Sequence, residues 1–266
     1  MPIVLSVPHS GLITPEPLRA QYAQDPDRLA LLSDLFVDVL FERAVDLGVT
    51  VVRTPYSRFV VDLNRFADDL SPESVVGARV RSQPGYHGKR GVIWAVSPNG
   101  YRMYKRPLTA QEASQRLVDY YYPYHQAVGK HLEALRERFG YAILVDGHSM
   151  PSRALNLRGR PRADVVPGDL NGESCAPELS RFVCRWWEDA GYIVHPNHPY
   201  RGGAITRQHA RPDQHIHAIQ LEFNRSLYMR EDTLEQSDGF ERLQTDCHRF
   251  LASLTALDLG YSLAAE

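Results

Sequence analysis

Residues 140–149 read GYAILVDGHS, and this stretch decides how the rest of the chain is interpreted. The glycine at its start is typical of a helix end, and the apolar run 141–145 predicts a buried strand. Asp146, His148 and Ser149 follow directly. In open α/β sheets, functional groups gather beyond the carboxyl ends of the strands. The stretch therefore predicts a central strand whose end carries titratable side chains into a site.

Strand and helix patterns alternate on both sides of this stretch. Helical spacing of apolar residues alternates with short β-branched runs, and several helical segments end at glycine. This alternation predicts an α/β fold with a largely parallel sheet. We expect one domain over residues 1–266, with irregular excursions at about 64–108, including a hairpin around 92–94, and at about 150–174. The expected strands are 3–7, 49–52, 59–63, 141–145, 192–195 and 216–223, and the expected helices are 27–47, 109–138 with a bend at Pro123, 176–190 and 234–257.

Composition excludes several classes of protein. The 266 residues are 43% hydrophobic and 23% charged, which is enough for a sizeable core and excludes a disordered chain. The 30 Lys and Arg against 32 Asp and Glu leave a net charge of −2, which argues against nucleic acid as a partner. No apolar run approaches the roughly 18 residues of a membrane span, and the start lacks a basic segment, so we expect neither a membrane partner nor a signal peptide. Three cysteines without a CxxC pair favour a cytoplasmic location, and no sequence feature indicates an oligomeric state.

His9 and His148 are the sharpest candidates for chemistry, because each follows an apolar strand and precedes a serine. Two neutral imidazoles and one carboxylate form the usual three-ligand shell of a catalytic zinc ion. By this reasoning the carboxylate is either Asp34 or Asp146. Asp146 has a second role open to it, the orientation of an imidazole, since residues two apart share one face of a strand. The alternative is that both histidines are hydrogen-bonded loop residues and that Asp34 is a helix N-terminal charge.

Glu222 is the candidate general base. Its neighbours are apolar, and burial raises the pKa of a carboxyl group toward the working range. A buried ion pair with Arg225 or another arginine is the alternative reading. Arg65, Arg207 and Arg225 lie near the expected site, and guanidinium groups bind carboxylates through two parallel hydrogen bonds. These arginines predict a small dianionic substrate.

Seven short motifs stand in order between residues 7 and 229. They are Val7-Pro-His-Ser-Gly11, Ser33-Asp34, Val61-Asp-Leu-Asn-Arg65, Tyr122-Pro-Tyr-His125, Val145-Asp-Gly-His-Ser-Met150, Pro199-Tyr-Arg-Gly-Gly203 and Gln220-Leu-Glu-Phe-Asn-Arg-Ser-Leu-Tyr-Met229. Together they resemble the N-formylglutamate amidohydrolase (N-formylglutamate deformylase) family of bacterial histidine degradation. Each motif is short, but seven of them in sequence over most of the chain make the resemblance specific.

The resemblance implies a three-layer α/β fold with a central, mostly parallel mixed sheet, similar to the zinc-dependent exopeptidases. It implies a metal-dependent amidohydrolase that converts N-formyl-L-glutamate to formate and L-glutamate. Zinc, or another divalent metal, is then expected on His9, Asp34 and His148, with Glu222 as the base. The metal is expected to polarise the formyl oxygen and to make the attacking water more acidic.

Five residues are expected to bind the substrate under this hypothesis, which competes with two other functions. Two alternatives also stay open. One is a related metal amidase that acts on another N-acyl amino acid or on a peptidoglycan fragment. The other is a non-catalytic protein that binds acidic metabolites. Under the main hypothesis the substrate is bound by Arg65, Arg207 and Arg225, together with Asn64 and Gly203 from the same motifs.

Overall fold

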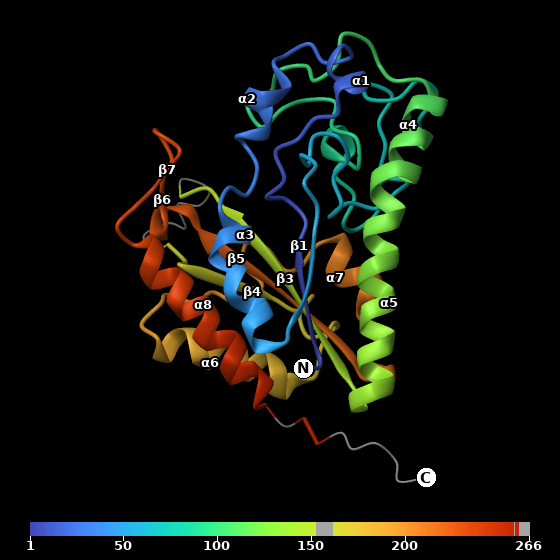
Figure 1. Cartoon of the computed structure of the whole chain (residues 1–266). Helices are drawn as coiled ribbons and strands as arrows, with labels where there is room; N and C mark the ends of the chain where they lie inside the picture. Colours follow the sequence, from blue (N-terminus) through green and yellow to red (C-terminus); the bar gives the residue numbers. More distant parts are fainter. Residues whose placement is uncertain (153–161, 258, 261–266) are drawn as a thin grey trace.

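A five-stranded sheet forms the centre of the computed structural model, which describes residues 1–152, 162–257 and 259–260 (Figure 1). Its strand order is β2 (Thr50–Arg53), β1 (Ile3–Val7), β3 (Ala142–Met150), β5 (Ile216–Asn224) and β4 (Val165–Gly168). The first four strands in this order run parallel, and β4 pairs antiparallel with β5. The predicted α/β class with a largely parallel sheet is therefore confirmed, and the sheet is mixed.

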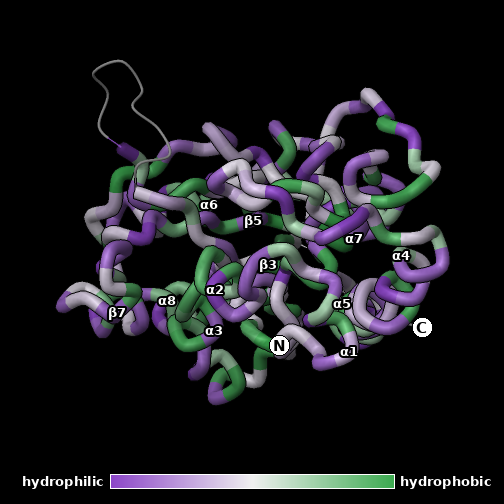
Figure 2. Tube along the Cα trace, turned by 90° about the horizontal axis from the view of Figure 1, so that it is seen from above, coloured by the Kyte–Doolittle hydropathy of each residue, from purple (hydrophilic) through white to green (hydrophobic). Residues whose placement is uncertain are grey.

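Helices cover both faces of the sheet. On one face lie α3 (Val37–Leu40), α6 (Pro177–Asp189) and α8 (Phe240–Thr255), and on the other lie α5 (Tyr122–Phe139) and α7 (Ala204–His209) (Figures 1 and 2). Side chains alternate along β1, so that Leu5 packs with α6 and α8 whereas Val4 packs with α5.

No helix of the described residues is long and apolar enough to cross a membrane. The remaining elements are α1 (Glu16–Arg19), α2 (Pro26–Ala30), α4 (Ala110–Arg116), the 3₁₀ turns η1 (Glu42–Leu47), η2 (Gly88–Arg90), η4 (Pro212–Gln214) and η5 (Arg225–Leu227), the π-helix η3 (Leu117–Tyr121), and the hairpin strands β6 (Met229–Arg230) and β7 (Glu235–Gln236).

The predicted helix 109–138 is confirmed as the continuous run α4-η3-α5. Thr109 and Glu112 form a reciprocal capping box at its start, and Gly140 ends it in a left-handed conformation. Close to the bend expected at Pro123, the helix contains the π-helical turn η3, which ends two residues before the proline. A proline lacks the N–H that an α-helix needs, and a π turn absorbs this mismatch.

The predicted helix 27–47 is wrong, because α2, a turn, α3 and η1 occupy that range. The apolar residues have helical spacing, but a backbone N–H of the turn donates to a carbonyl outside the predicted helix. The Asp34 N–H donates to the carbonyl of His9 at 3.1 Å, and Phe36 adopts a left-handed φ of 65°. A helix requires bonds to the carbonyl four residues back. Asp34 therefore lies in a turn rather than early in a helix.

Several predicted strands and boundaries are also wrong. Segments 59–63 and 92–94 form turns and bends, and 192–195 contributes a single bridge between Val165 and Val194. The apolar side chains of 59–63 and 92–94 are buried, so burial without strand pairing explains those two patterns, whereas Ile193 is exposed. The strand predicted at 141–145 extends to Met150, and the last helix begins at Phe240 because the β6–β7 hairpin precedes it. Residues 153–161 of the predicted excursion 150–174 lie outside the described residues, and β4 falls within the rest.

Candidate active site

Three neighbouring strands carry candidate side chains to one edge of the sheet. His9 lies two residues beyond β1, His148 lies near the end of β3, and Glu222 lies near the end of β5 in register with His148. Because these strands are adjacent and parallel, their carboxyl ends meet at the same edge. All three side chains are buried. The sheet thus brings together residues that are far apart in the sequence.

Asp34 reaches this edge from the turn between α2 and α3. Its backbone N–H donates to the His9 carbonyl, and its own carbonyl accepts the Ser10 hydroxyl at 2.9 Å. Ser10 Oγ also accepts the N–H of Asp38 at 3.2 Å, which ties the start of α3 to the loop after β1. The loop after β1 and the turn before α3 therefore fix each other, and the Asp34 carboxylate faces the histidines.

One carboxylate oxygen of Asp34 lies between the two imidazoles. His148 Nδ1 lies 3.1 Å from Asp34 Oδ2, and His9 Nδ1 lies 3.4 Å from the same oxygen. Ligand atoms of the three residues all lie within 4.8 Å of one another. His9 Nδ1 is buried and makes no hydrogen bond within the described part of the chain. Two imidazole nitrogens and a carboxylate are a donor set that zinc accepts, so the residues fit a divalent metal.

The opposite ring nitrogens of both histidines also face carboxylates. His148 Nε2 lies 2.9 Å from Asp146 Oδ2, and His9 Nε2 lies 2.8 Å from Asp62 Oδ1. Asp146 therefore stands on the Nε2 side of His148, away from the Nδ1 atoms that converge on Asp34. Its other oxygen accepts the Ser6 hydroxyl at 2.7 Å. Such carboxylate–imidazole pairs fix the orientation of metal-binding histidines.

The pKa values follow from these contacts. Burial acts to raise the pKa of Asp34, but its close contacts with the imidazoles of His148 and His9 outweigh it and hold this pKa well below its usual range. Burial likewise opposes ionisation of Asp62, and the Arg58 charge holds its pKa well below the usual range. For His148, burial lowers the pKa, but the Asp146 carboxylate and Asp34 raise it well above its usual value. The carboxylates of Asp34 and Asp62 are thus held in the ionised form beside the imidazoles.

Buried aspartates in the cluster outnumber the guanidinium groups that pair with them. Arg58 Nη2 lies 2.7 Å from Asp62 Oδ2, and Arg225 Nη2 lies 3.3 Å from Asp34 Oδ1. Buried charge without a counter-charge is costly, and when both imidazoles are neutral, as metal ligands are, two guanidinium groups do not balance three aspartates. A divalent cation at the converging donor atoms would supply the missing charge. The carboxylates, each at most 7% exposed, are Asp34, Asp62, Asp146 and Glu222.

Glu222 differs from the other carboxylates in its surroundings. Its pKa is raised to about 7, chiefly by burial; the His148 charge lowers it and the Asp34 charge raises it further. Gln220, two residues earlier on the same face of β5, donates its amide N–H to Glu222 Oε1 at 3.0 Å. A carboxyl group with this pKa exchanges protons near neutral pH. The ion pair with Arg225 that formed the alternative reading is not found: Arg225 bonds instead to Asp34, Ser33 and Ser149.

The predicted substrate-binding arginines occupy different environments. Arg65 is half-buried, and its guanidinium donates to the carbonyls of Arg90 and Asn64 at 3.0 and 2.9 Å. It makes no ion pair within the described ranges of the chain. Arg207 is exposed and pairs with Glu173 at 2.6 Å, so the structure does not bring it into the cluster. Arg225 and Arg65 are therefore the two predicted arginines placed near it.

Asn64 and Gly203 are packed against each other. The Asn64 amide oxygen accepts the N–H of Ile205 at 2.9 Å, and its Nδ2 lies 3.2 Å from His148 Nε2. A Cβ on Gly203 would collide with the Asn64 amide, which explains why glycine stands there. In this structure Asn64 contacts the Nε2 side of His148, and Gly203 packs against Asn64.

Sequence reasoning missed Asp62 and Arg58. Asp62 belongs to a quoted motif, but the sequence analysis gave it no role. The sequence contained a signal for Asp62, because an aspartate inside the apolar run FVVDL is rarely buried unless its charge is paired. Arg58 stands four residues earlier, and its ion pair with Asp62 depends on a turn that the strand prediction for 59–63 obscured.

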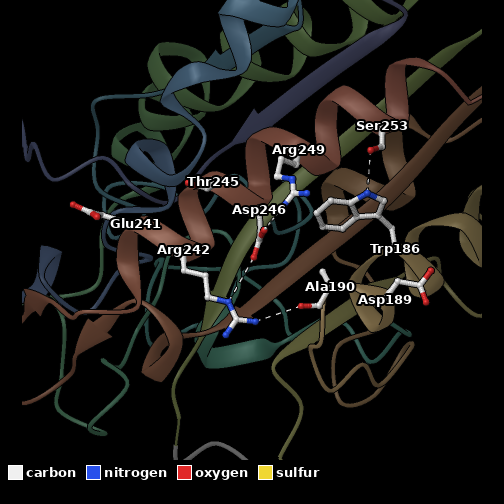
Figure 3. A pocket seen from close by; sticks show the side chains of 9 residues that line it. All are labelled: Trp186, Asp189, Ala190, Glu241, Arg242, Thr245, Asp246, Arg249 and Ser253. Atoms are coloured by element: carbon white, nitrogen blue, oxygen red, sulfur yellow. Dashed lines mark hydrogen bonds and ion pairs between the residues drawn. The ribbon is translucent and has the colours of Figure 1, made fainter.

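A separate pocket of about 890 Å³ lies between α6 and α8 (Figure 3). Its charged groups largely pair with one another: Asp246 Oδ2 lies 3.8 Å from Arg242 Nε, and Asp246 Oδ1 lies 3.8 Å from Arg249 Nη1. Trp186 donates its indole N–H to Ser253 Oγ at 3.0 Å. The pocket contains none of the predicted site residues.

Known proteins resemble this chain over most of its length. Residues 1–229 match a family described as N-formylglutamate amidohydrolase. An N-formylglutamate deformylase of Pseudomonas putida is 36% identical over 237 residues, covering 87% of this chain and 83% of that protein. One of Pseudomonas aeruginosa is 30% identical over 261 residues, covering 96% and 93%. A crystal structure of N-formylglutamate amidohydrolase from Ralstonia eutropha JMP134 is similar, with a TM-score of 0.88, 33% identity and coverage of 96% and 93%.

Proposed function

The chain belongs to the N-formylglutamate amidohydrolase family, and on this premise we propose that it hydrolyses N-formyl-L-glutamate to formate and L-glutamate in histidine degradation. One observation carries the proposal furthest. Two buried imidazoles converge on Asp34 at the carboxyl edge of the sheet, with Glu222 beside them. We also propose the zinc-dependent exopeptidase-like class for the fold, on the strength of the mixed sheet and a site at this edge.

The metal ligands in this proposal are His9, Asp34 and His148. The unbonded Nδ1 of His9 supports this choice, as does the excess of buried aspartates over paired guanidinium groups around it. Asp34 is favoured over Asp146 because Asp146 contacts the Nε2 atom of His148, where it orients the ring. Zinc or another divalent ion, when bound, polarises a carbonyl group and makes a water molecule more acidic.

Glu222 is the general base in this proposal. Its buried carboxyl group, with a pKa of about 7, takes a proton from the water that attacks the formyl carbon. It then delivers that proton to the amide nitrogen as the carbon–nitrogen bond breaks. Formate leaves with the former carbonyl carbon, and the nitrogen becomes the amino group of glutamate. Burial therefore sets the proton affinity that both halves of the reaction need.

Arginines bind the two substrate carboxylates in this proposal. Arg65 supports the role best, because its guanidinium is half-buried and has no carboxylate partner in the described part of the chain. Arg225 adds positive charge beside Asp34 and helps to stabilise negative charge that develops on the formyl oxygen. Asn64 and Gly203 keep His148 and the start of α7 in place. Arg207 joins the substrate only if its pair with Glu173 opens.

A formate-release assay tests this function. The purified protein is treated with a chelator, reloaded with zinc, and assayed with N-formyl-L-glutamate at each stage. We expect formate release to disappear on chelation and to return with zinc. N-Acetyl-L-glutamate tests the acyl group, and N-formyl-L-alanine, which lacks the second carboxylate, tests the dianion requirement; both should react more slowly. Turnover that is indifferent to chelation contradicts the metal role, and binding without formate release contradicts hydrolysis.

A further inference from the structure

We propose that Asp62 is the positioning residue of His9: it holds the imidazole in the tautomer whose bare Nδ1 faces Asp34 and the cation. The inference rests on the proposed function, which makes His9 a metal ligand. Asp62 would then do for His9 what Asp146 does for His148. The two histidines would be oriented by separate buried carboxylates that approach from different segments of the chain.

The hydrogen bond between Asp62 and His9 determines the tautomer. Asp62 Oδ1 lies 2.8 Å from His9 Nε2, and both side chains are almost completely buried. An ionised carboxylate accepts hydrogen bonds and donates none, so the proton must reside on Nε2. The neutral ring then carries its lone pair on Nδ1. This is the nitrogen that has no hydrogen bond among the described residues and that faces Asp34.

Asp62 is itself held by donors on both oxygens. Oδ2 accepts Arg58 Nη2 at 2.7 Å and the indole N–H of Trp94 at 2.9 Å. Oδ1 accepts the backbone N–H of Asn64 at 3.0 Å in addition to His9. The Arg58 guanidinium also lies over the Trp94 ring, 5.2 Å from its centroid. These bonds leave Oδ1 pointing at His9 and prevent rotation of the carboxylate.

The backbone around Asp62 is anchored as well. The Asp62 N–H donates to the carbonyl of Val92 at 2.8 Å, and the carbonyl of Leu63 accepts Nε2 of His125 at 3.0 Å. Position 62 is therefore fixed on both sides by partners far away in the sequence. A fixed backbone and a fixed carboxylate are what orientation of a metal ligand to within a fraction of an ångström requires.

A purely structural role for Asp62 is the competing explanation. The carboxylate also neutralises the buried Arg58, and this alone would make Asp62 important for folding. The two explanations differ in what they predict for zinc. A structural role predicts altered stability with the metal affinity of the folded protein unchanged. A positioning role predicts weaker metal binding in protein that remains folded.

Zinc affinity of purified variants, measured by competition with a chromogenic chelator, separates the two roles. We expect Asp62→Asn to weaken zinc binding by roughly 10–100-fold, the usual effect of losing an outer partner of a metal-bound histidine. Arg58→Gln, which leaves Asp62 Oδ1 beside His9, should weaken it less. Asp246→Asn is the matched control, because Asp246 is a buried carboxylate that accepts the Tyr192 hydroxyl far from the cluster in sequence. Its affinity should equal that of the unmodified protein.

Nitrogen-15 spectra of the histidine rings in unmodified, zinc-loaded protein give a readout that needs no variant. We expect His9 to carry its proton on Nε2. A proton on Nδ1 overturns the inference, and so does unchanged zinc affinity in folded Asp62→Asn. If Asp62→Asn fails to fold, unchanged zinc affinity in folded Arg58→Gln counts against the inference together with the spectrum. Unmodified protein that binds no zinc overturns the proposed metal site itself, which distinguishes that failure from this one.

Discussion

Two pairs of buried histidines contact the segment 62–65, and they use their ring nitrogens differently. In the first pair, His9 and His148 each turn one nitrogen toward Asp34 and the other toward a separate carboxylate. In the second pair, His125 Nε2 donates to the carbonyl of Leu63, and its Nδ1 lies 2.9 Å from His209 Nε2. Because a carbonyl accepts only, His125 Nδ1 carries the lone pair, and His209 must donate to it.

The difference shows that the neighbouring groups, more than burial, determine what a buried histidine can do. Burial lowers the pKa of His125 to about 3 and that of His209 to about 4, so both rings are neutral in the fold. Carboxylates overcome burial at His148 and raise its pKa well above the usual value. The second pair uses the His125 lone pair in an internal hydrogen bond. The first pair directs its Nδ1 atoms at a carboxylate, which is the arrangement that suits a cation.

The sharpest test of the contrast removes one histidine from each pair. We expect His148→Ala to abolish formate release and to weaken zinc binding by more than the roughly 100-fold that loss of an outer partner costs. His209→Ala should retain its zinc, because neither of its ring nitrogens is a proposed ligand, and should lose about 2–4 kcal/mol of unfolding free energy through a cavity and a broken hydrogen bond. Elemental analysis and urea unfolding measure both quantities. Equal zinc loss in the two variants would contradict the claim that only the first pair binds the cation.

In the proposed function, Glu222 is the general base beside the first pair. We expect Glu222→Gln to lower kcat by about 10²–10⁴-fold, because the amide cannot accept the water proton. Its zinc content should stay at the unmodified level. Steady-state kinetics with elemental analysis checks both. Full turnover in a zinc-loaded Glu222→Gln variant would refute the base assignment.

Arg65 lies at the end of the segment that both pairs contact, and it allows a comparison with Arg207. We expect Arg65→Met to raise KM for N-formyl-L-glutamate by about 10–100-fold, the value of a lost charge-assisted hydrogen bond of 1.5–3 kcal/mol. Arg207→Met removes an exposed pair with Glu173 and should change KM little. Initial-rate measurements on both variants test this difference. A larger effect at Arg207 would show that its surface pair opens when substrate binds.

The second pair should also make the free energy of unfolding depend on pH. Both histidines have lower pKa values folded than the usual 6.5, so the folded protein binds fewer protons and stability falls as pH falls from about 6.5 toward 4 and then 3. The slope should reach at most about 1.4 kcal/mol per pH unit for each histidine. Urea unfolding of metal-free protein, unmodified and with His125→Gln and His209→Gln combined, measures it. An identical slope in the double variant would contradict the lowered pKa values of His125 and His209.

Sequence reasoning found the parts of the site that local pattern encodes. The run 141–145 marks a central strand, and the positions of His148 and Glu222 near strand ends follow from the same rule. It did not find the Asp34 turn, since the bond that interrupts the helix comes from the His9 carbonyl. β4 was missed because Val-Val-Pro-Gly is a short edge strand with two residues that strands usually avoid.

The roles of side chains around the proposed metal site depend on contacts that no local pattern contains. Asp62 lies in an apolar run whose turn brings it to His9, and the strand prediction for 59–63 concealed that turn. Arg207 lies near the predicted site in the sequence, yet the structure pairs it with Glu173 at the surface. Proximity along the chain is therefore a weak guide to which arginine lies beside the buried cluster.

The central claim is that His9, Asp34 and His148 hold one divalent cation through the Nδ1 atoms of both rings. Anomalous diffraction at the zinc absorption edge, from crystals of the zinc-loaded protein, tests it most directly. The account predicts a single strong peak at about 2.0–2.2 Å from His9 Nδ1, His148 Nδ1 and an Asp34 oxygen. A peak bound through Nε2 or through Asp146, or no peak at this edge of the sheet, would contradict it.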